Sequence, residues 1–178
     1  MRMHPLTRGL AAVLMFALPA LPAMAARFEL QGGVSYMDSY SAPAAFGEVI
    51  FDEHQFGSSN FTWAPDITAG WIGGRDLKRF DNSRYNGSRY TTRDDIGLVG
   101  AGVRIHYGPA NAWYRRLFIS EQPTVHTGRT LALSSTYEFM TTVGYQGDHW
   151  SVGFRHISNA GIHEPNRGET MAVVGIAF

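Results

Sequence analysis

The amino-acid sequence predicts an all-β fold, an eight-stranded antiparallel transmembrane β-barrel of the outer-membrane type. Apolar and polar residues alternate with period two over most of the chain, which is typical of strands with two different faces. Clusters of Gly, Pro, Asn and Asp separate the alternating segments, and no segment after the N-terminus has the apolar length of a spanning helix. The alternation divides into eight segments, and eight is the smallest common strand number of a closed antiparallel barrel.

Residues 1–25 have the features of a cleaved secretory signal peptide. Two arginines form a basic start, residues 10–21 form a short apolar run, and an Ala-Met-Ala sequence immediately precedes Ala26. A transmembrane anchor needs about 20 apolar residues, and two prolines cut this run short. We therefore predict cleavage before Ala26 and one barrel domain over 26–178.

The composition of the mature chain excludes several classes of protein. Because Arg2 and Arg8 leave with the signal peptide, the remaining 153 residues hold 13 basic and 15 acidic side chains, a formal net charge of −2. That balance argues against a nucleic acid as the main partner. The chain has no cysteine, which excludes disulfides and thiolate metal sites. We predict no metal and no cofactor.

The eight strands follow one another along the mature chain. The alternation places them at 27–37, 48–54, 60–73, 94–107, 112–122, 130–145, 149–159 and 169–178. Three glycines in the fourth segment suit a sheet that curves until it closes. In the sixth segment, aromatic residues end an apolar face and small or polar residues lie opposite, which favours lipid outside and a polar lumen. Periodicity does not exclude a soluble barrel of the lipocalin kind, whose apolar face surrounds a ligand.

The connections between the strands differ in length. GPAN and QGD are tight, whereas SYSAPAAFG, GRDLKRFDNSRYNGSRYTTR, EQPTVHTG and AGIHEPNRG are long or polar. Short turns at one rim and long loops at the other are typical of bacterial outer-membrane barrels, whose short turns face the periplasm. The chain also ends on Phe178, and a terminal aromatic resembles the signal that such proteins present to the barrel-insertion machinery. These features predict a location in the outer membrane.

The seventh strand carries a polar pair on its apolar face. Trp150, Val152 and Phe154 share one face, and His156 and Ser158 continue it. If the QGD turn is periplasmic, this strand runs outward, and the pair faces lipid in the outer leaflet. Residues at i and i+2 are close enough for an imidazole to activate a serine hydroxyl as a nucleophile. The alternative is that the pair lies in the interfacial girdle, where His and Ser are tolerated.

The longer sequence RHISNAG, followed by PNRG and the terminal strand, resembles the lipid A 3-O-deacylases, the PagL family of outer-membrane acyl hydrolases. These enzymes share the signature His-x-Ser-Asn-(Ala/Gly) on the penultimate strand of an eight-stranded barrel. The detailed resemblance runs from His156 to about Gly168, and the rest agrees in length, export signal, strand count and final residue. It implies an esterase that removes the 3-hydroxyacyl chain at position 3 of lipid A, the anchor of lipopolysaccharide.

The resemblance also implies a role for each residue of the motif. By position, Ser158 matches the nucleophile and His156 the general base. Asn159 and the backbone N–H of Gly161 match the groups that bind the oxyanion. In acyl transfer, stabilisation of the oxyanion supplies a large part of the rate enhancement. As alternatives, Asn159 is a turn residue and Gly161 supplies a left-handed backbone position in the loop.

The family has a glutamate in the last strand that orients the histidine, and Glu169 is the candidate for it. Alignment on Pro-Asn-x-Gly places Thr170 at this position instead, and counting back from Phe178 puts Thr170 outward and Glu169 in the lumen. Glu169 can reach the site only if the last strand begins with a bulge, or if Glu169 still belongs to the loop and precedes the regular strand pairing. Glu164 and His163 are substitutes from the loop; otherwise water or Thr170 holds the ring.

Other functions stay open at this point. One is a non-enzymatic small barrel that stabilises the membrane or acts as an adhesin. Another is an outer-membrane phospholipase or acyltransferase, although no acidic cluster suited to calcium lies near Ser158 in the sequence. The arginine-rich segment 74–95 suits contact with lipid A phosphates, but such segments are more often simply solvated. The sequence also leaves open whether the protein forms a homodimer.

Overall fold

The computed structural model describes residues 26–77 and 91–178. Its strands are β1 (Arg27–Met37), β2 (Tyr40–Ile50), β3 (His54–Gln55), β4 (Phe61–Ile72), β5 (Ile96–Tyr107), β6 (Leu117–His126), β7 (Tyr137–Gln146), β8 (Trp150–Ser158) and β9 (Glu169–Ala177). A 3-10 turn, η2 (Trp113–Arg116), precedes β6. In the described part of the chain, no helix is long and apolar enough to cross a membrane. The predicted signal peptide, 1–25, lies outside the described residues.

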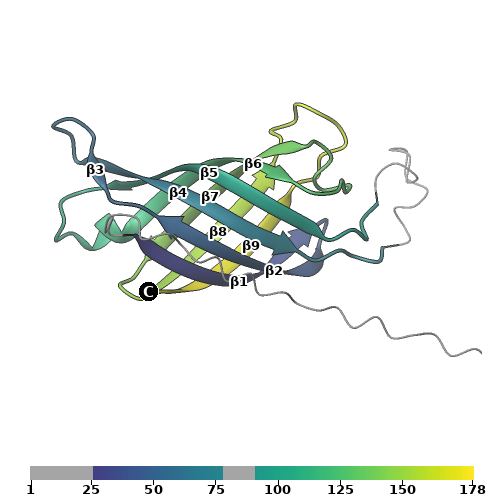
Figure 1. Cartoon of the computed structure of the whole chain (residues 1–178), viewed down its shortest axis with the longest axis horizontal. Coiled ribbons are helices and arrows are strands. Elements are labelled where there is room, and N and C mark those ends of the chain that lie inside the picture. The colour runs from purple at the N-terminus through teal and green to yellow at the C-terminus, as the bar shows by residue number, and fades with distance from the viewer. Residues whose placement is uncertain (1–25, 78–90) are drawn as a thin grey trace, which may run out of the picture.

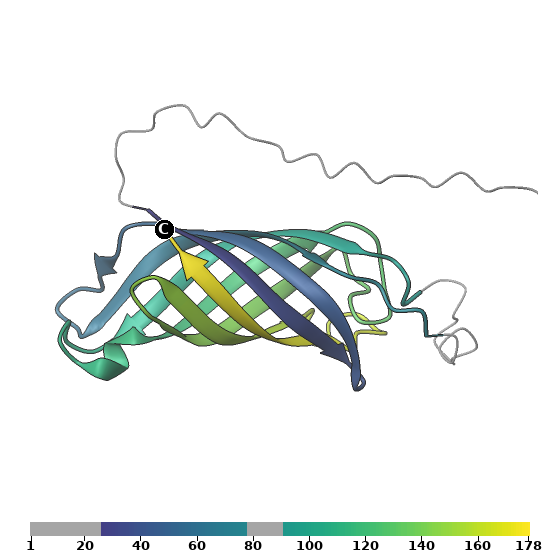
Figure 2. The same ribbon diagram turned by 90° about the horizontal axis from the view of Figure 1, so that it is seen from below.

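The eight long strands form a closed antiparallel barrel. Each pairs with the next long strand along the chain, and β3 pairs with the start of β4. Closure comes from pairing between β1 and β9, for example Tyr36 with Thr170; Figure 2 shows these first and last strands side by side. The C-terminus lies at the same end as β3 and η2, opposite the loop before β9 (Figure 1). The predicted fold class is confirmed.

The predicted second strand, 48–54, is wrong. β2 occupies residues 40–50, because Asp38 and Ser39 form a tight turn where a long loop was expected. Both turn residues have positive φ, 49° and 71°, the backbone conformation of hairpin turns that match the twist of strands. The small residues that follow alternate between lumen and outer wall, so they extend the strand.

Two further strand boundaries are corrected. β6 begins at Leu117 instead of 112, because η2 occupies the preceding residues, and it continues to His126. Its ladder with β5 is interrupted around Pro123, which has no N–H to donate. β7 begins at Tyr137 instead of 130. The residues just before it lie buried at the loop end of the lumen.

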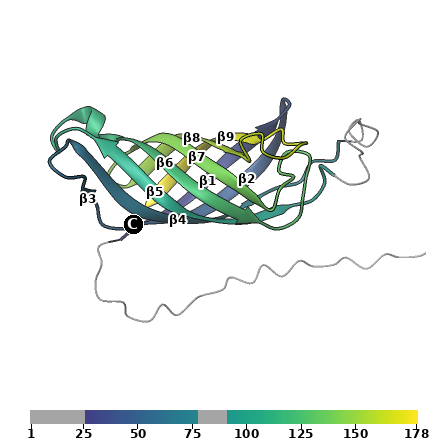
Figure 3. The same ribbon diagram turned by 90° about the horizontal axis from the view of Figure 1, so that it is seen from above.

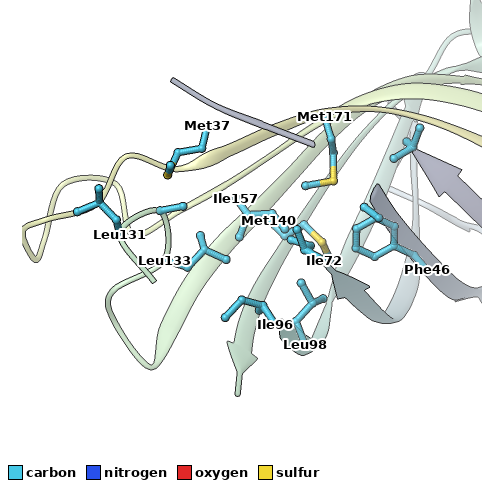
Figure 4. Packing of buried hydrophobic residues seen from close by; sticks show 13 residues of the cluster. Met37, Phe46, Ile72, Ile96, Leu98, Leu131, Leu133, Met140, Ile157 and Met171 are labelled. Atoms are coloured by element: carbon cyan, nitrogen blue, oxygen red, sulfur yellow. The ribbon is translucent and has the colours of Figure 1, made fainter. Parts of the chain in front are cut away.

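The lumen is filled, with an apolar half and a polar half. Near the loops, Leu131 and Leu133 from the segment before β7 pack with Met140, Ile157 and Met171 from the strands (Figure 4). Deeper in the barrel, charged side chains pair with one another. The outer wall instead exposes large apolar side chains, including Leu30, Val99, Phe154 and Val174. An apolar outside around a polar interior is typical of a membrane barrel, so the lipocalin alternative is wrong.

Candidate active site

The site lies on the outer wall at the end of β8. Arg155 and Ile157 are buried in the lumen, whereas Phe154 and His156 are exposed on the outer wall. Ser158, the last residue of β8, lies on the same face as His156 and is half-buried. This end of β8 carries the loop of residues 159–168 (Figure 3). The period-two alternation therefore places an imidazole and a hydroxyl where lipid would surround the barrel.

His156 is held from the side of β9. Its Nδ1 lies 2.9 Å from the hydroxyl oxygen of Thr170, the residue opposite it in the β8–β9 ladder. A Cβ atom on Gly168 would lie 2.8 Å from Cε1 and 3.2 Å from Nε2 of the imidazole, and Gly168 has φ +69°. Only glycine therefore leaves room for the ring here. Because Ile157 pairs with Glu169, Gly168 lies level with Ser158, and the Nε2 edge is turned toward that level.

Glu169 lies in the lumen, on the opposite side of the wall from His156. Its carboxylate accepts hydrogen bonds from both terminal nitrogens of Arg75, at 2.7 and 2.8 Å, and from the hydroxyl of Ser35. The β8–β9 register runs through Glu169 with no bulge. The prediction that Glu169 orients the imidazole is corrected, since the alternation that turns Thr170 outward turns Glu169 inward.

Asn159 and Gly161 organise the loop after β8. The side-chain amide of Asn159 is fully buried and donates to the Ser135 hydroxyl at 2.5 Å and to the His163 carbonyl at 2.8 Å. The backbone N–H of Gly161 donates to Oδ1 of Asn159 at 3.0 Å. Both groups predicted to hold the oxyanion thus already have hydrogen-bond partners, in this loop and in the segment before β7. The loop substitutes for an orienting acid, His163 and Glu164, are exposed to solvent.

Several residues that shape this site were missed from the sequence. The sequence pattern places Gly168 in a loop, whereas its positive φ of 69° fits a glycine just before a strand. Arg75 belongs to the arginine-rich segment 74–95, of which residues 78–90 lie outside the described residues. Thr141 lies next to His156 on the outer wall, and Glu121 lies beyond it on β6; alternation within β6 and β7 could have identified both.

Comparison with known proteins places this geometry in a family context. Residues 99–178 match the family model described as lipid A 3-O-deacylase (PagL). The matched range runs from within β5 to the end of the chain and contains every residue of the motif. The resemblance to the PagL family is confirmed.

Solved structures resemble the chain in fold. The crystal structure of the outer membrane enzyme PagL has a TM-score of 0.50 at 15% identity, covering 84% of this chain and 98% of the PagL chain. That of Ail, the attachment invasion locus protein of Yersinia pestis, has a TM-score of 0.37 at 7% identity, covering 86% and 96%. No curated protein matches the sequence. At 15% identity, PagL supports the barrel fold, while the family model supports the relationship of the C-terminal part.

Proposed function

We propose that this protein is a lipid A 3-O-deacylase, an outer-membrane esterase that hydrolyses the ester-linked 3-hydroxyacyl chain at position 3 of lipid A. The observation that carries the proposal is the position of His156 and Ser158 on the apolar outer wall, at the loop end of β8. A site there meets the acyl esters of membrane lipids and not solutes in the lumen. The match of residues 99–178 to the PagL family model supports lipid A as the substrate.

The expected reaction is acyl transfer through a serine ester. With a proton on Nδ1 donated to the Thr170 hydroxyl, Nε2 of His156 is free to accept the proton of Ser158. The serine oxygen attacks the ester carbonyl, and the imidazolium returns the proton to the departing sugar oxygen. Water then hydrolyses the acyl-serine with the same base, releasing a 3-hydroxy fatty acid and restoring the hydroxyl. No step requires a metal.

The oxyanion needs a donor close to Ser158. The backbone N–H of Asn159 directly follows the nucleophile, and its hydrogen bond to Oδ1 of Asn166 is long, at 3.4 Å. We assign the oxyanion role to this N–H, since a long bond is readily exchanged for a charged acceptor. Gly161 N–H can join it only if its bond to the Asn159 side chain opens.

Orientation and processing form part of the same proposal. The rim with the 159–168 loop faces the exterior, which puts the site in the outer leaflet, where lipid A lies. Residues 1–25 are removed before the barrel, residues 26–178, inserts. N-terminal sequencing of the protein from outer membranes should begin at Ala26.

The central test is Ser158→Ala. Expressed in a host without such an activity, the unchanged protein should convert lipid A to a form lacking one 3-hydroxyacyl chain, detected by mass spectrometry. Ser158→Ala should reduce this conversion by at least about a thousandfold, because the nucleophile is lost. Ser41→Ala, a change of another outer-wall serine, is the matched control and should keep activity.

Two outcomes would contradict the proposal. If Ser158→Ala folds, by its heat-modifiable mobility on gels, and still trims lipid A, then Ser158 is not the nucleophile. If the unchanged protein leaves lipid A intact and instead cleaves phospholipids assayed alongside, the substrate is a different lipid.

A further inference from the structure

We propose that Glu121 and Thr141 form a subsite on the outer wall that accepts a hydrogen bond from the 3-hydroxyl group of the acyl chain being removed. The inference rests on the proposed function and names the part of the substrate that distinguishes it from ordinary acyl esters. It predicts that this pair determines a preference for 3-hydroxylated chains.

The pair belongs to a polar row that crosses four neighbouring strands on the outer wall. Glu121 of β6 pairs with Thr141 of β7, Thr141 pairs with His156 of β8, and His156 pairs with Thr170 of β9. Glu121, His156 and Thr170 are exposed and Thr141 is half-buried. The row therefore extends from the catalytic histidine across the wall on the side away from Thr170.

Glu121 is out of place on this surface unless it has a function. Its neighbours on the same face of β6 are Ile119 and Pro123, and Val103 lies opposite on β5. Ionisable side chains that face lipid are costly and tend to mark functional sites. The Thr141 hydroxyl donates to Oε2 of Glu121 at 2.6 Å. A carboxylate offers about four lone-pair positions when ionised, so this bond leaves acceptor capacity on an exposed side chain.

The chemistry of the bilayer restricts what that capacity can bind. The hydrocarbon part of an ordinary phospholipid contains no hydrogen-bond donor. A 3-hydroxyacyl chain carries one, two carbons beyond its ester carbonyl. A hydrogen-bond acceptor slightly nearer to the membrane centre than the ester carbonyl is therefore suited to 3-hydroxylated chains and to few other components of the membrane.

The register places the pair at a suitable distance from the nucleophile. Ser158 lies opposite Phe139, so Thr141 is one strand across and two residues further from the loop end. With strands about 4.8 Å apart and about 3.4 Å per residue, the two Cα atoms are about 8 Å apart. The 3-hydroxyl is only two carbons beyond the ester carbonyl, so the side chains of Thr141 and Glu121, with Glu121 one strand further across, have to span the rest of this distance along the wall toward it.

The pair is also positioned to serve the substrate and not the imidazole. The His156 ring leans toward β9, where it contacts Thr170 and Gly168. Glu121 and Thr141 lie on the other side of β8. A substrate chain on the wall of β7 and β8 would lie against them while its carbonyl is at Ser158.

The test compares two lipid A analogues that differ only in the 3-hydroxyl of the scissile chain. The unchanged protein should show a higher kcat/KM for the hydroxylated chain. Glu121→Leu and Thr141→Val should each lower the ratio of the two kcat/KM values by about tenfold or more, the effect of losing a hydrogen bond to a charged group. The ratio cancels any change in folding or catalysis common to both substrates. Ser41→Val, in the same row beyond Tyr36, should leave the ratio unchanged.

Two results would overturn the proposal: no preference in the unchanged protein, or an unaltered ratio in both variants, including the case in which activity on both substrates falls equally. Ser158→Ala separates these from failure of the proposed function. If it abolishes cleavage of both analogues while Glu121→Leu keeps the ratio, the deacylase assignment stands and the subsite is wrong. If it retains cleavage, Ser158 is not the nucleophile, and if the unchanged protein cleaves neither analogue, the deacylase assignment itself fails.

Discussion

Thr170 meets the imidazole of His156 with a neutral hydroxyl, at a position where the family resemblance implies a glutamate. A hydroxyl can accept the Nδ1 proton and hold the ring in one tautomer. In the proposed mechanism, it supplies no negative charge to stabilise the imidazolium that would form when Ser158 is deprotonated. Thr170 therefore orients the His156 ring but adds no negative charge beside it.

Replacing Thr170 should therefore lower or raise kcat, depending on whether the new side chain removes the hydrogen-bond acceptor or adds a negative charge. Thr170→Val removes the acceptor and should lower kcat about tenfold with little change in KM, since only the orientation of the base is lost. Thr170→Glu keeps an acceptor, adds charge and should raise kcat above that of the unchanged protein. Release of 3-hydroxy fatty acid in detergent micelles measures both. Wild-type kcat in the valine variant would mean that the ring needs no partner here.

At the scale of elements, β9 connects the site to the lumen through its alternation. Glu169, next to Thr170, faces inward and binds Arg75 from the segment after β4. Arg75 also donates to the carbonyls of Ser35 and Tyr40, on β1 and β2. One buried ion pair thus joins β9, β1, β2 and the end of β4 just beneath the site. Because Glu169 lies in this buried pair behind the wall that carries His156, we expect it to support that wall without contributing to the chemistry.

Glu169→Gln tests this structural role. It should lower the free energy of unfolding by about 3 kcal/mol, because the Arg75 guanidinium stays buried without its counter-charge. Turnover per folded molecule should be nearly unchanged. Urea unfolding followed by tryptophan fluorescence, combined with activity normalised to folded protein, measures the two effects separately. A large loss of kcat with unaltered stability would instead return Glu169 to the catalytic group.

At the scale of the whole molecule, the barrel encloses a buried charged cluster. Glu48 lies at the centre, pairing with Arg104 at 2.8 Å and Arg155 at 3.3 Å, and Gln31 donates to it at 2.7 Å. Arg104 and Arg155 are among the most buried side chains. Strands far apart in the sequence are joined across the lumen by these contacts, which favours a rigid wall on which an outward-facing site keeps its geometry.

Glu48→Leu should destabilise the barrel by about 3–5 kcal/mol, since it leaves two arginines buried without a shared carboxylate. The matched control is Glu53→Leu at the opposite rim, where the carboxylate pairs with Arg115 but is 39% exposed. Its effect should be about 1 kcal/mol or less, because solvent screens that pair. Urea midpoints of refolded protein in micelles provide the comparison. Equal effects would show that burial of the central cluster is not what stabilises the barrel.

Much of the fold follows from local pattern. The alternation that predicts 27–37, 60–73, 94–107, 149–159 and 169–178 agrees closely with the structure, because the two faces of a strand meet different surroundings wherever it pairs. The same alternation puts His156, Ser158 and Thr170 on the outer wall. Alternation does not predict the strand boundary where a tight turn forms, as at Asp38 and Ser39. It also does not predict that residues 130–136 leave the wall and close the end of the lumen.

The sequence by itself determined the alternating strands, a serine and a histidine on the apolar face of one of them, and a family motif around the pair, since each depends on neighbours along one strand. Only the tertiary structure decided that Arg75 holds Glu169, that the Asn159 side chain is buried in the loop, and that Glu121 and Thr141 lie beside the site. These contacts join segments far apart in the chain. They depend on strand register and loop packing, which no single segment encodes.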